Sequence, residues 1–153
     1  MKDIFIDTNI ACRFSNPMDP HLKDLLDWLM ADGDEDNRAY LVVSKKLLRE
    51  YLSSCRGAYG ETSLPVLINK LTQEGRIENI TNSQIQLFKE QYFTKTIDKK
   101  LRSNNEDRNH IPVVMLSERK LALTNDDNFT YDLTHFPGFT VVVSDRPEKI
   151  PYK

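Results

Sequence analysis

Four short runs of apolar and β-branched residues, each bounded by polar positions, predict β-strands in this chain. They cover residues 3–7, 39–44, 120–124 and 139–144. In other segments apolar positions recur every three or four residues, which predicts amphipathic helices over 20–30, 44–54, 63–74 and 81–101. Strands that alternate with helices need crossover connections. We therefore expect an α/β fold, a three-layer α/β/α sandwich with a central, mainly parallel sheet.

One segment, 110–116, fits two kinds of element. It is apolar enough to be a buried strand, but it contains Pro112. Proline is poorly tolerated in a central strand and well placed in the first turns of a helix. We therefore predict a helix over 107–119, with Asp107 at its start, where a carboxylate meets unpaired backbone N–H groups.

Length and composition are those of one globular domain. The chain has 153 residues, of which 39% are hydrophobic and 29% charged, and we expect a single domain over 1–153. Its formal net charge is only −2, from 21 Lys and Arg against 23 Asp and Glu, so any site for a polyanion must be local. No stretch approaches the roughly 18 apolar residues of a membrane span, and no secretory leader is evident. We expect a cytoplasmic protein with no membrane partner.

The two cysteines, Cys12 and Cys55, lie far apart in the sequence and form no C-x-x-C motif. This spacing predicts neither a disulfide framework nor a structural zinc site. A reducing cytosol fits this usage best.

Acidic residues stand close to the ends of the predicted strands. Asp7 directly follows the first strand, and Asp126 and Asp127 follow the third. Glu50 lies about two turns into the helix after the second strand, and Asp107 begins the helix before the third. In open α/β sheets, ligands bind outside the carboxyl ends of the strands, where the strand order reverses. Acids from distant parts of the chain are therefore expected to converge there.

A cluster of acids needs compensating positive charge. Carboxylates brought together without it repel one another, and one or more would take up a proton. Mg²⁺ removes this conflict, because it prefers oxygen ligands and is usually held by one or two carboxylates together with waters and substrate phosphate. A pair of such ions about 4 Å apart can activate a water and stabilise the leaving oxygen of a phosphodiester. The acids therefore suggest metal-dependent hydrolysis of phosphodiester bonds.

Four successive segments resemble the acidic motifs of the PIN-domain family. They read IFIDTNI, SKKLLREY, EDRNHIPVVMLS and LALTNDDNF, occur in the family's order and span nearly the whole chain. The resemblance implies a PIN-like fold and a ribonuclease that uses Mg²⁺ or Mn²⁺ to cut single-stranded or looped RNA. Such proteins are often the toxin of a toxin–antitoxin pair, and they also act in RNA processing and decay.

Carried over residue by residue, the resemblance implies four acids that bind the metal and act in catalysis: Asp7, Glu50, Asp107 and Asp126. It also implies that Asn9 and Thr124 orient these acids through hydrogen bonds. As a toxin, the chain would have a small antitoxin as its partner, which would block the acidic cleft with a basic side chain.

Two of these acids have a rival next to them. The helix after Asp107 is usually rich in small residues in the family, whereas here it contains the early Pro112, so Glu106 is an alternative third acid. Asp127 competes with Asp126 for the fourth position, and one of the two is expected to face solvent.

Each acid also has a purely structural interpretation. Asp7 and Asp107 can be helix caps, Glu50 can be an exposed residue paired with Lys46 four positions earlier, and Asp126 can be a turn former. The motif context favours the metal role for all four.

Basic residues near the acids are candidates for phosphate contacts. We assign substrate binding to Arg49 and Arg102, because a guanidinium can grip a phosphate at two points. No histidine pair has zinc-ligand spacing, and we expect His110 to be an ordinary hydrogen-bonded side chain outside the catalytic set.

The competing function is a catalytically weak or inactive PIN-like module that binds RNA or protein without cutting. In either case a homodimer is a possible assembly, and the apolar helical face at 64–71 is a suitable surface for it.

Overall fold

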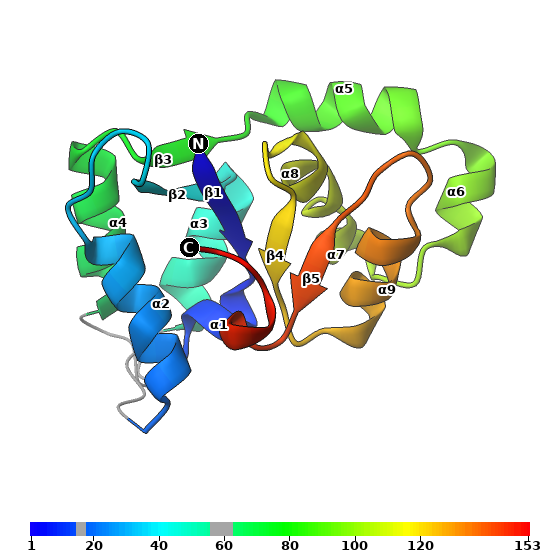
Figure 1. Cartoon of the computed structure of the whole chain (residues 1–153). Helices are drawn as coiled ribbons and strands as arrows, with labels where there is room; N and C mark the ends of the chain where they lie inside the picture. Colours follow the sequence, from blue (N-terminus) through cyan, green and yellow to red (C-terminus); the bar gives the residue numbers. More distant parts are fainter. Residues whose placement is uncertain (15–17, 56–62) are drawn as a thin grey trace.

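A five-stranded, all-parallel sheet runs through the centre of the computed structural model, which describes residues 1–14, 18–55 and 63–153 (Figure 1). The strand order is β3-β2-β1-β4-β5. The strands are β1 (Lys2–Ile6), β2 (Ala39–Val43), β3 (Ile77–Asn79), β4 (Leu121–Leu123) and β5 (Val142–Ser144). The predicted sheet is therefore confirmed, and every strand pair in it is parallel.

Helices flank this sheet and connect its strands (Figure 1). In the first half of the chain they are α1 (Thr8–Ala11), α2 (Pro20–Met30), α3 (Lys45–Ser54) and α4 (Ser63–Gln73). In the second half they are α5 (Asn82–Tyr92), α6 (Lys95–Lys100), α7 (Asn105–Arg108), α8 (Ile111–Leu116) and α9 (Asp127–His135), followed by the 3-10 turn η1 (Pro147–Lys149). The three predicted helices at 20–30, 44–54 and 63–74 correspond to α2, α3 and α4.

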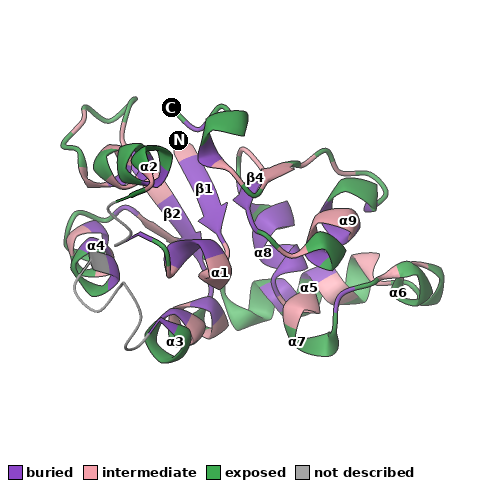
Figure 2. Cartoon of the chain, turned by 90° about the horizontal axis from the view of Figure 1, so that it is seen from below, coloured by how far each residue is buried: buried purple, intermediate pink, exposed green. Residues whose placement is uncertain are grey.

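The core lies on both faces of the sheet. Ile4, Phe5 and Ile6 of β1 are all completely buried, although successive side chains of a strand point to opposite faces. Figure 2 shows the buried strands enclosed by helices whose outer surfaces are exposed. Burial on both faces is the arrangement expected of parallel sheets, and it confirms the three-layer sandwich.

The order of strands reverses beside β1. From β1 the chain proceeds to β2 and β3 on one side and then crosses to β4 and β5 on the other. Ile6 is in register with Leu123 of β4, so the residues that follow these two strands emerge next to each other. This switch point is where open α/β sheets bind ligands.

The long helix predicted over 81–101 is wrong as a single element. It is divided into α5 and α6, because Phe93 leaves the helical conformation with ψ 68° and the Thr94 side chain accepts the backbone N–H of Ile97. A threonine hydroxyl in this position starts a new helix.

The single helix predicted over 107–119 is also wrong. The segment forms the two short helices α7 and α8, and Asn104, not Asp107, caps the first of them by accepting the backbone N–H of Asp107 at 2.8 Å. Pro112 does lie in the first turn of α8, where its missing N–H has no cost.

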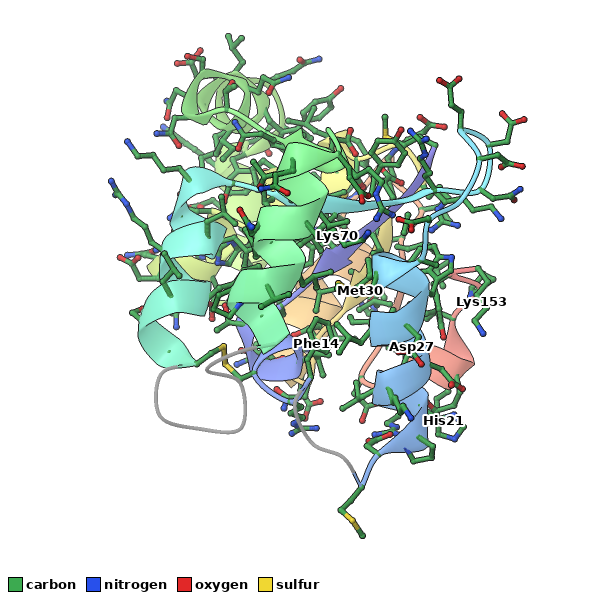
Figure 3. All side chains as sticks on the ribbon, turned by 90° about the vertical axis from the view of Figure 1, so that its left-hand side faces the viewer. Phe14, His21, Asp27, Met30, Lys70 and Lys153 are labelled. Carbon is green, nitrogen blue, oxygen red and sulfur yellow. A yellow bond between two sulfur atoms is a disulfide. The ribbon has the colours of Figure 1, made fainter. Side chains whose placement is uncertain are left out.

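The expectation for the cysteines is wrong as well. Cys12 and Cys55 form a disulfide, drawn as the yellow bond in Figure 3, with a Cα–Cα distance of 4.9 Å. Cys12 ends α1 and Cys55 ends α3, and these two helices pack together. A sequence separation of 43 residues gave no sign of this contact, and the argument from free thiols to a reducing compartment is lost with it.

The helical face at 64–71 is not available to a partner. Leu64, Leu67 and Leu71 are buried in the core, so the expectation that this face forms the surface of a homodimer is wrong. Within the described ranges, no helix is both long enough and apolar enough to cross a membrane.

Candidate functional site

The site is built around the contact between the residues that follow β1 and β4. The backbone N–H of Asp7 donates to the carbonyl of Leu123 at 2.8 Å, which continues the strand pairing by one residue. The hydroxyl of Thr124 then donates to Oδ2 of Asp7 at 2.6 Å and accepts the backbone N–H of Asp126 at 3.1 Å. One threonine thus links the first and fourth acids of the sequence prediction.

Asn9 contacts the same carboxylate oxygen as Thr124. Its side-chain amide donates to Oδ2 of Asp7 at 3.2 Å, and its Oδ1 accepts the backbone N–H of Asn125 at 3.2 Å. Asp7 also caps α1, since its Oδ1 accepts the backbone N–H of Thr8 at 2.8 Å. The cap and the orienting contacts are therefore compatible, because they use different oxygens.

Glu50 reaches the site from α3. Ser44 caps this helix, and Glu50 lies on its sixth position, with 28% of its side chain exposed. Its Oε2 accepts the Thr8 hydroxyl at 3.3 Å and contacts Nε2 of His110 at 2.9 Å, while Oε1 lies 3.5 Å from Nζ of Lys46. The glutamate thus has the predicted partner in Lys46 and two partners that were not predicted.

His110 is a hydrogen-bonded side chain, as the sequence predicted, but its contact with Glu50 was not predicted. Its ring is buried between Phe5 and Phe129, with centroid distances of 6.0 and 6.4 Å, and it meets Glu50 from the start of α8. Its place three residues after Asp107 was the only signal that could have found it.

The third acid is half-buried, and its rival is not. Asp107 lies in the first turn of α7, whereas the neighbouring Glu106 is exposed and forms an ion pair with Lys46. Asp107 is close enough to Asp7, Glu50 and Asp126 to be affected by their charges.

Asp126 and Asp127 differ in the same way. Asp126 is half-buried and caps α9 by accepting the backbone N–H of Phe129 at 3.0 Å, while Asp127 is exposed in the first turn of that helix. Asp126 is therefore the more buried of the two, and its capping bond uses only Oδ1.

Electrostatics distinguish the members of this cluster. Burial raises the pKa of Asp7 despite the hydrogen bond from Thr124, and burial together with the charges of Asp126, Asp7 and Glu50 raises the pKa of Asp107. Burial acts in the same direction on Glu50, but its pKa is lowered overall by His110, Lys46 and Thr8. At Asp7 and Asp107, burial therefore disfavours the charged carboxylate more than the nearby His110 favours it.

These carboxylates suit a hard divalent cation that binds few protein ligands and keeps several of its waters. Within residues 1–14, 18–55 and 63–153, no three His, Cys, Asp or Glu side chains gather closely enough to form a metal cage. Mg²⁺ does not need one, because it commonly keeps several waters and binds through one or two carboxylates. Half-buried carboxylates with raised pKa values supply that kind of ligand.

The two arginines assigned to substrate lie on the surface. Arg49 is exposed on α3 and makes no ion pair or hydrogen bond through its side chain with the residues that the structure describes. Arg102 is exposed in the loop between α6 and α7, and its guanidinium lies 3.4 Å from the ring centroid of Tyr131.

The elements that carry these residues surround the carboxyl ends of β1 and β4. Figure 2, which views the molecule from that side, shows α1 near the centre with α3, α7 and α9 around it. Four separate stretches of sequence thus meet over the switch point of the sheet.

Comparison with known proteins agrees with this arrangement. No family model matches the sequence, and no curated protein matches it either. Among solved structures, the chain is similar to a chain of VapBC2 from Rickettsia felis, crystallised bound to a DNA fragment from the VapBC2 promoter. The two share 18% sequence identity with a TM-score of 0.55, over 94% of this chain and 98% of that chain. The chain therefore has a PIN-like α/β/α fold.

Proposed function

We propose that this protein is a metal-dependent endoribonuclease that hydrolyses phosphodiester bonds in single-stranded or looped RNA. The observation that carries the proposal is the position of Asp107 at the switch point, where the charges of Asp126, Asp7 and Glu50 from three other segments act on its carboxyl and, with burial, raise its pKa. A raised pKa is typical of groups at functional sites, and carboxylates are the ligands that Mg²⁺ or Mn²⁺ takes.

Each acid and its neighbours have a role in this proposal. Asp7, Asp107 and Asp126 hold the metal, directly or through water, and Thr124 and Asn9 fix the orientation of Asp7. When bound, the metal supplies an activated water and stabilises the leaving oxygen of the phosphodiester.

Glu50 completes the acidic set from α3. The contacts from His110 and Thr8 hold its carboxylate in place before substrate arrives. Arg49 and Arg102 neutralise phosphates of the RNA on either side of the acids, which offsets the repulsion between a polyanion and a negative site.

A role as a toxin with a protein antitoxin is part of the proposal. VapBC2 is a PIN-domain toxin–antitoxin complex, and this chain has the same fold over nearly its whole length. An antitoxin that inserts a basic side chain among Asp7, Asp107 and Asp126 would compensate their charge as the metal does. A homodimer of the chain is compatible with this partner, through a surface other than the buried face of α4.

One observation favours a second candidate function, a PIN-like module that binds RNA or protein with weak or no cleavage. Lys46 and His110 already compensate Glu50 without any metal, which is the arrangement expected of acids kept for structure. In that case the site would bind no metal, and substitutions of its acids would leave the binding of RNA or protein unchanged.

Cleavage of a mixed set of single-stranded and structured RNAs, with Mg²⁺, Mn²⁺ or EDTA, decides between these functions. The native protein is compared with Asp7→Asn and Asp126→Asn, and with Asp127→Asn as a matched control that removes one exposed charge next to the cluster. We expect cleavage that requires metal, is abolished by the first two substitutions and is retained by the control. Metal-independent binding without cleavage in all four folded proteins would favour the binding module.

A further inference from the structure

Three planar side chains, Arg102, Tyr131 and His135, form a stack on the surface. The guanidinium of Arg102 lies over the ring of Tyr131 with Cζ 3.4 Å from the centroid. The ring of His135 lies 3.9 Å from the same centroid, with 19° between the ring planes. We call these three residues the Arg102 stack.

The short distances determine how the three groups are arranged. A guanidinium whose Cζ is 3.4 Å from the ring centroid must lie nearly parallel to the ring, because an upright one would drive a nitrogen into it. His135 must lie on the opposite face of Tyr131, since two groups this close to one centroid cannot share a face. Tyr131 is therefore the inner member, and the outer faces of Arg102 and His135, both exposed residues, end the stack.

The stack is held in place from α9. Buried Asp132 accepts the backbone N–H groups of Arg102 at 2.9 Å and Ser103 at 2.8 Å, so residues 131 and 132 fix both the side chain and the backbone of Arg102. Nδ1 of His135 donates to the carbonyl of Tyr131 at 2.9 Å, which fixes the third ring. A surface ordered before its ligand arrives loses less entropy when it binds.

Both halves of the stack belong to segments that carry acids of the site. Arg102 precedes Asp107 by five residues, and Tyr131 follows Asp126 by five, about 7 Å along the axis of α9. Figure 2 shows α6, α7 and α9 on the same side of the molecule. The stack is thus carried by the same two segments as Asp107 and Asp126, on the α9 side of the molecule.

The charge of this surface suits a nucleic acid. The last turn of α6 carries the exposed Lys99 and Lys100 just before Arg102. The guanidinium N–H groups of Arg102 form no hydrogen bond or ion pair with the described residues. They can therefore donate to a phosphate while the plane itself receives a base, as arginine planes and aromatic rings do in single-strand RNA recognition.

We propose that the Arg102 stack is a platform on which an unpaired RNA base stacks next to the bond that is cut. The position of that bond rests on the proposed function. Single-stranded RNA is the ligand because only unpaired bases expose a face for stacking. The preference between bases is weak, since every base has such a face.

Binding of a short single-stranded oligoribonucleotide tests this directly. The protein carries Asp7→Asn so that the RNA stays intact, and 2-aminopurine or an abasic residue replaces one nucleotide at a time. We expect 2-aminopurine fluorescence to be quenched at one position, and an abasic residue there to weaken binding by about tenfold. Tyr131→Ala should weaken binding of the intact RNA to a similar extent and make the abasic substitution nearly silent.

Three further variants separate stacking from charge and from folding. Tyr131→Phe keeps the ring and should bind as well as its parent, whereas Arg102→Lys keeps the charge without the plane and should lose most of the abasic effect. Lys23→Gln removes one exposed charge on α2, on the far side of the molecule from α9 in Figure 2, and should have little effect.

The outcomes distinguish this proposal from the nuclease itself. If native protein cleaves RNA but Tyr131→Ala binds it no worse than Lys23→Gln does, the platform is overturned, the nuclease stands, and the surface is left for a protein partner. If binding depends on Tyr131 as described but no RNA is cut, the platform stands and the nuclease fails. Absence of any RNA binding overturns both.

Discussion

The buried ring of His110 contacts the half-buried carboxylate of Glu50, with Nε2 2.9 Å from Oε2. The two residues are 60 positions apart: Glu50 lies in α3, and His110 directly precedes α8. This contact ties the second acidic motif to the third. Substituting a residue that holds a metal ligand in position typically costs about 10–100-fold in metal affinity or activity.

Replacing His110 by phenylalanine should therefore separate activity from stability. The other ring nitrogen, Nδ1, is buried without a partner among the described residues, so a phenylalanine removes an unsatisfied polar atom and fits among Phe5 and Phe129. We expect metal-dependent cleavage by His110→Phe to fall by about 10–100-fold while the free energy of unfolding is unchanged or higher. Cleavage rates and urea unfolding measure the two effects, with exposed His21→Phe as the control. A drop in stability with full activity would contradict this role of His110.

Metal binding should stabilise the native protein, and Asp107 should be needed for it. A metal present at 100 times its dissociation constant stabilises the folded state by about 2.7 kcal/mol, or about 5–10 °C in the melting temperature of a domain of this size. We expect this shift with Mg²⁺ or Mn²⁺ for the native chain and not for Asp107→Asn. Thermal melts with and without EDTA measure it.

Glu106→Gln is the matched control for that experiment. Glu106 is exposed and paired with Lys46, so its substitution should preserve the metal-induced shift. Loss of the shift in Glu106→Gln and its retention in Asp107→Asn would assign the third position to the glutamate.

Glu78, which is not one of the candidate site residues, makes the free energy of unfolding depend on pH. Burial, reinforced by the hydrogen bond and charge of Asp3 and by the charge of Glu118, raises the pKa of Glu78 from 4.5 to about 8. Between these two values the unfolded chain has lost a proton that the folded chain keeps. The free energy of unfolding therefore falls as pH rises from about 4.5 to about 8 and is independent of this group outside that range.

Glu78→Gln should remove this dependence. The variant should be about as stable as the native protein at pH 4.5 and increasingly more stable than it up to pH 8. Urea unfolding of both proteins across this range, at constant ionic strength, measures the difference. Parallel pH profiles for the two proteins would show that Glu78 titrates as an ordinary glutamate.

The sequence pattern predicted the strands and helices that are determined by regular spacing of apolar residues within one segment. The apolar alternation of β1, β2 and β4 and the helical spacing of α2, α3 and α4 predicted those elements, because each buries a regular set of side chains. The motifs at Asp7 and Asp126 follow strands that pair directly, so their proximity could be expected from the position of the switch point.

The missed features depend on contacts between distant residues. Strand β3 has only three residues and no fully buried side chain, so its pattern is too weak to detect. The Cys12–Cys55 disulfide and the His110–Glu50 contact are both set by how α1, α3 and α8 pack, and no periodicity in one segment reports that. The break between α5 and α6 had a local signal in Thr94, which was outweighed by the helical pattern around it.

The disulfide connects the ends of the two helices that begin after Asp7 and carry Glu50, so it affects both stability and the site. Closing a loop of 43 residues removes entropy from the unfolded chain worth about 4 kcal/mol in the loop-entropy model. The site itself is held by the contacts of Thr8 and His110 with Glu50, and these do not involve sulfur.

Reduction of the Cys12–Cys55 disulfide should therefore lower the free energy of unfolding by about 2–4 kcal/mol and leave metal-dependent cleavage of the folded protein within about twofold. Urea unfolding with and without dithiothreitol, next to the reductant-insensitive double variant Cys12→Ser with Cys55→Ser, measures the first effect. If reductant abolishes cleavage while the protein remains folded, the disulfide also positions the acids, and the hydrogen bonds between α1, α3 and α8 are insufficient to do so.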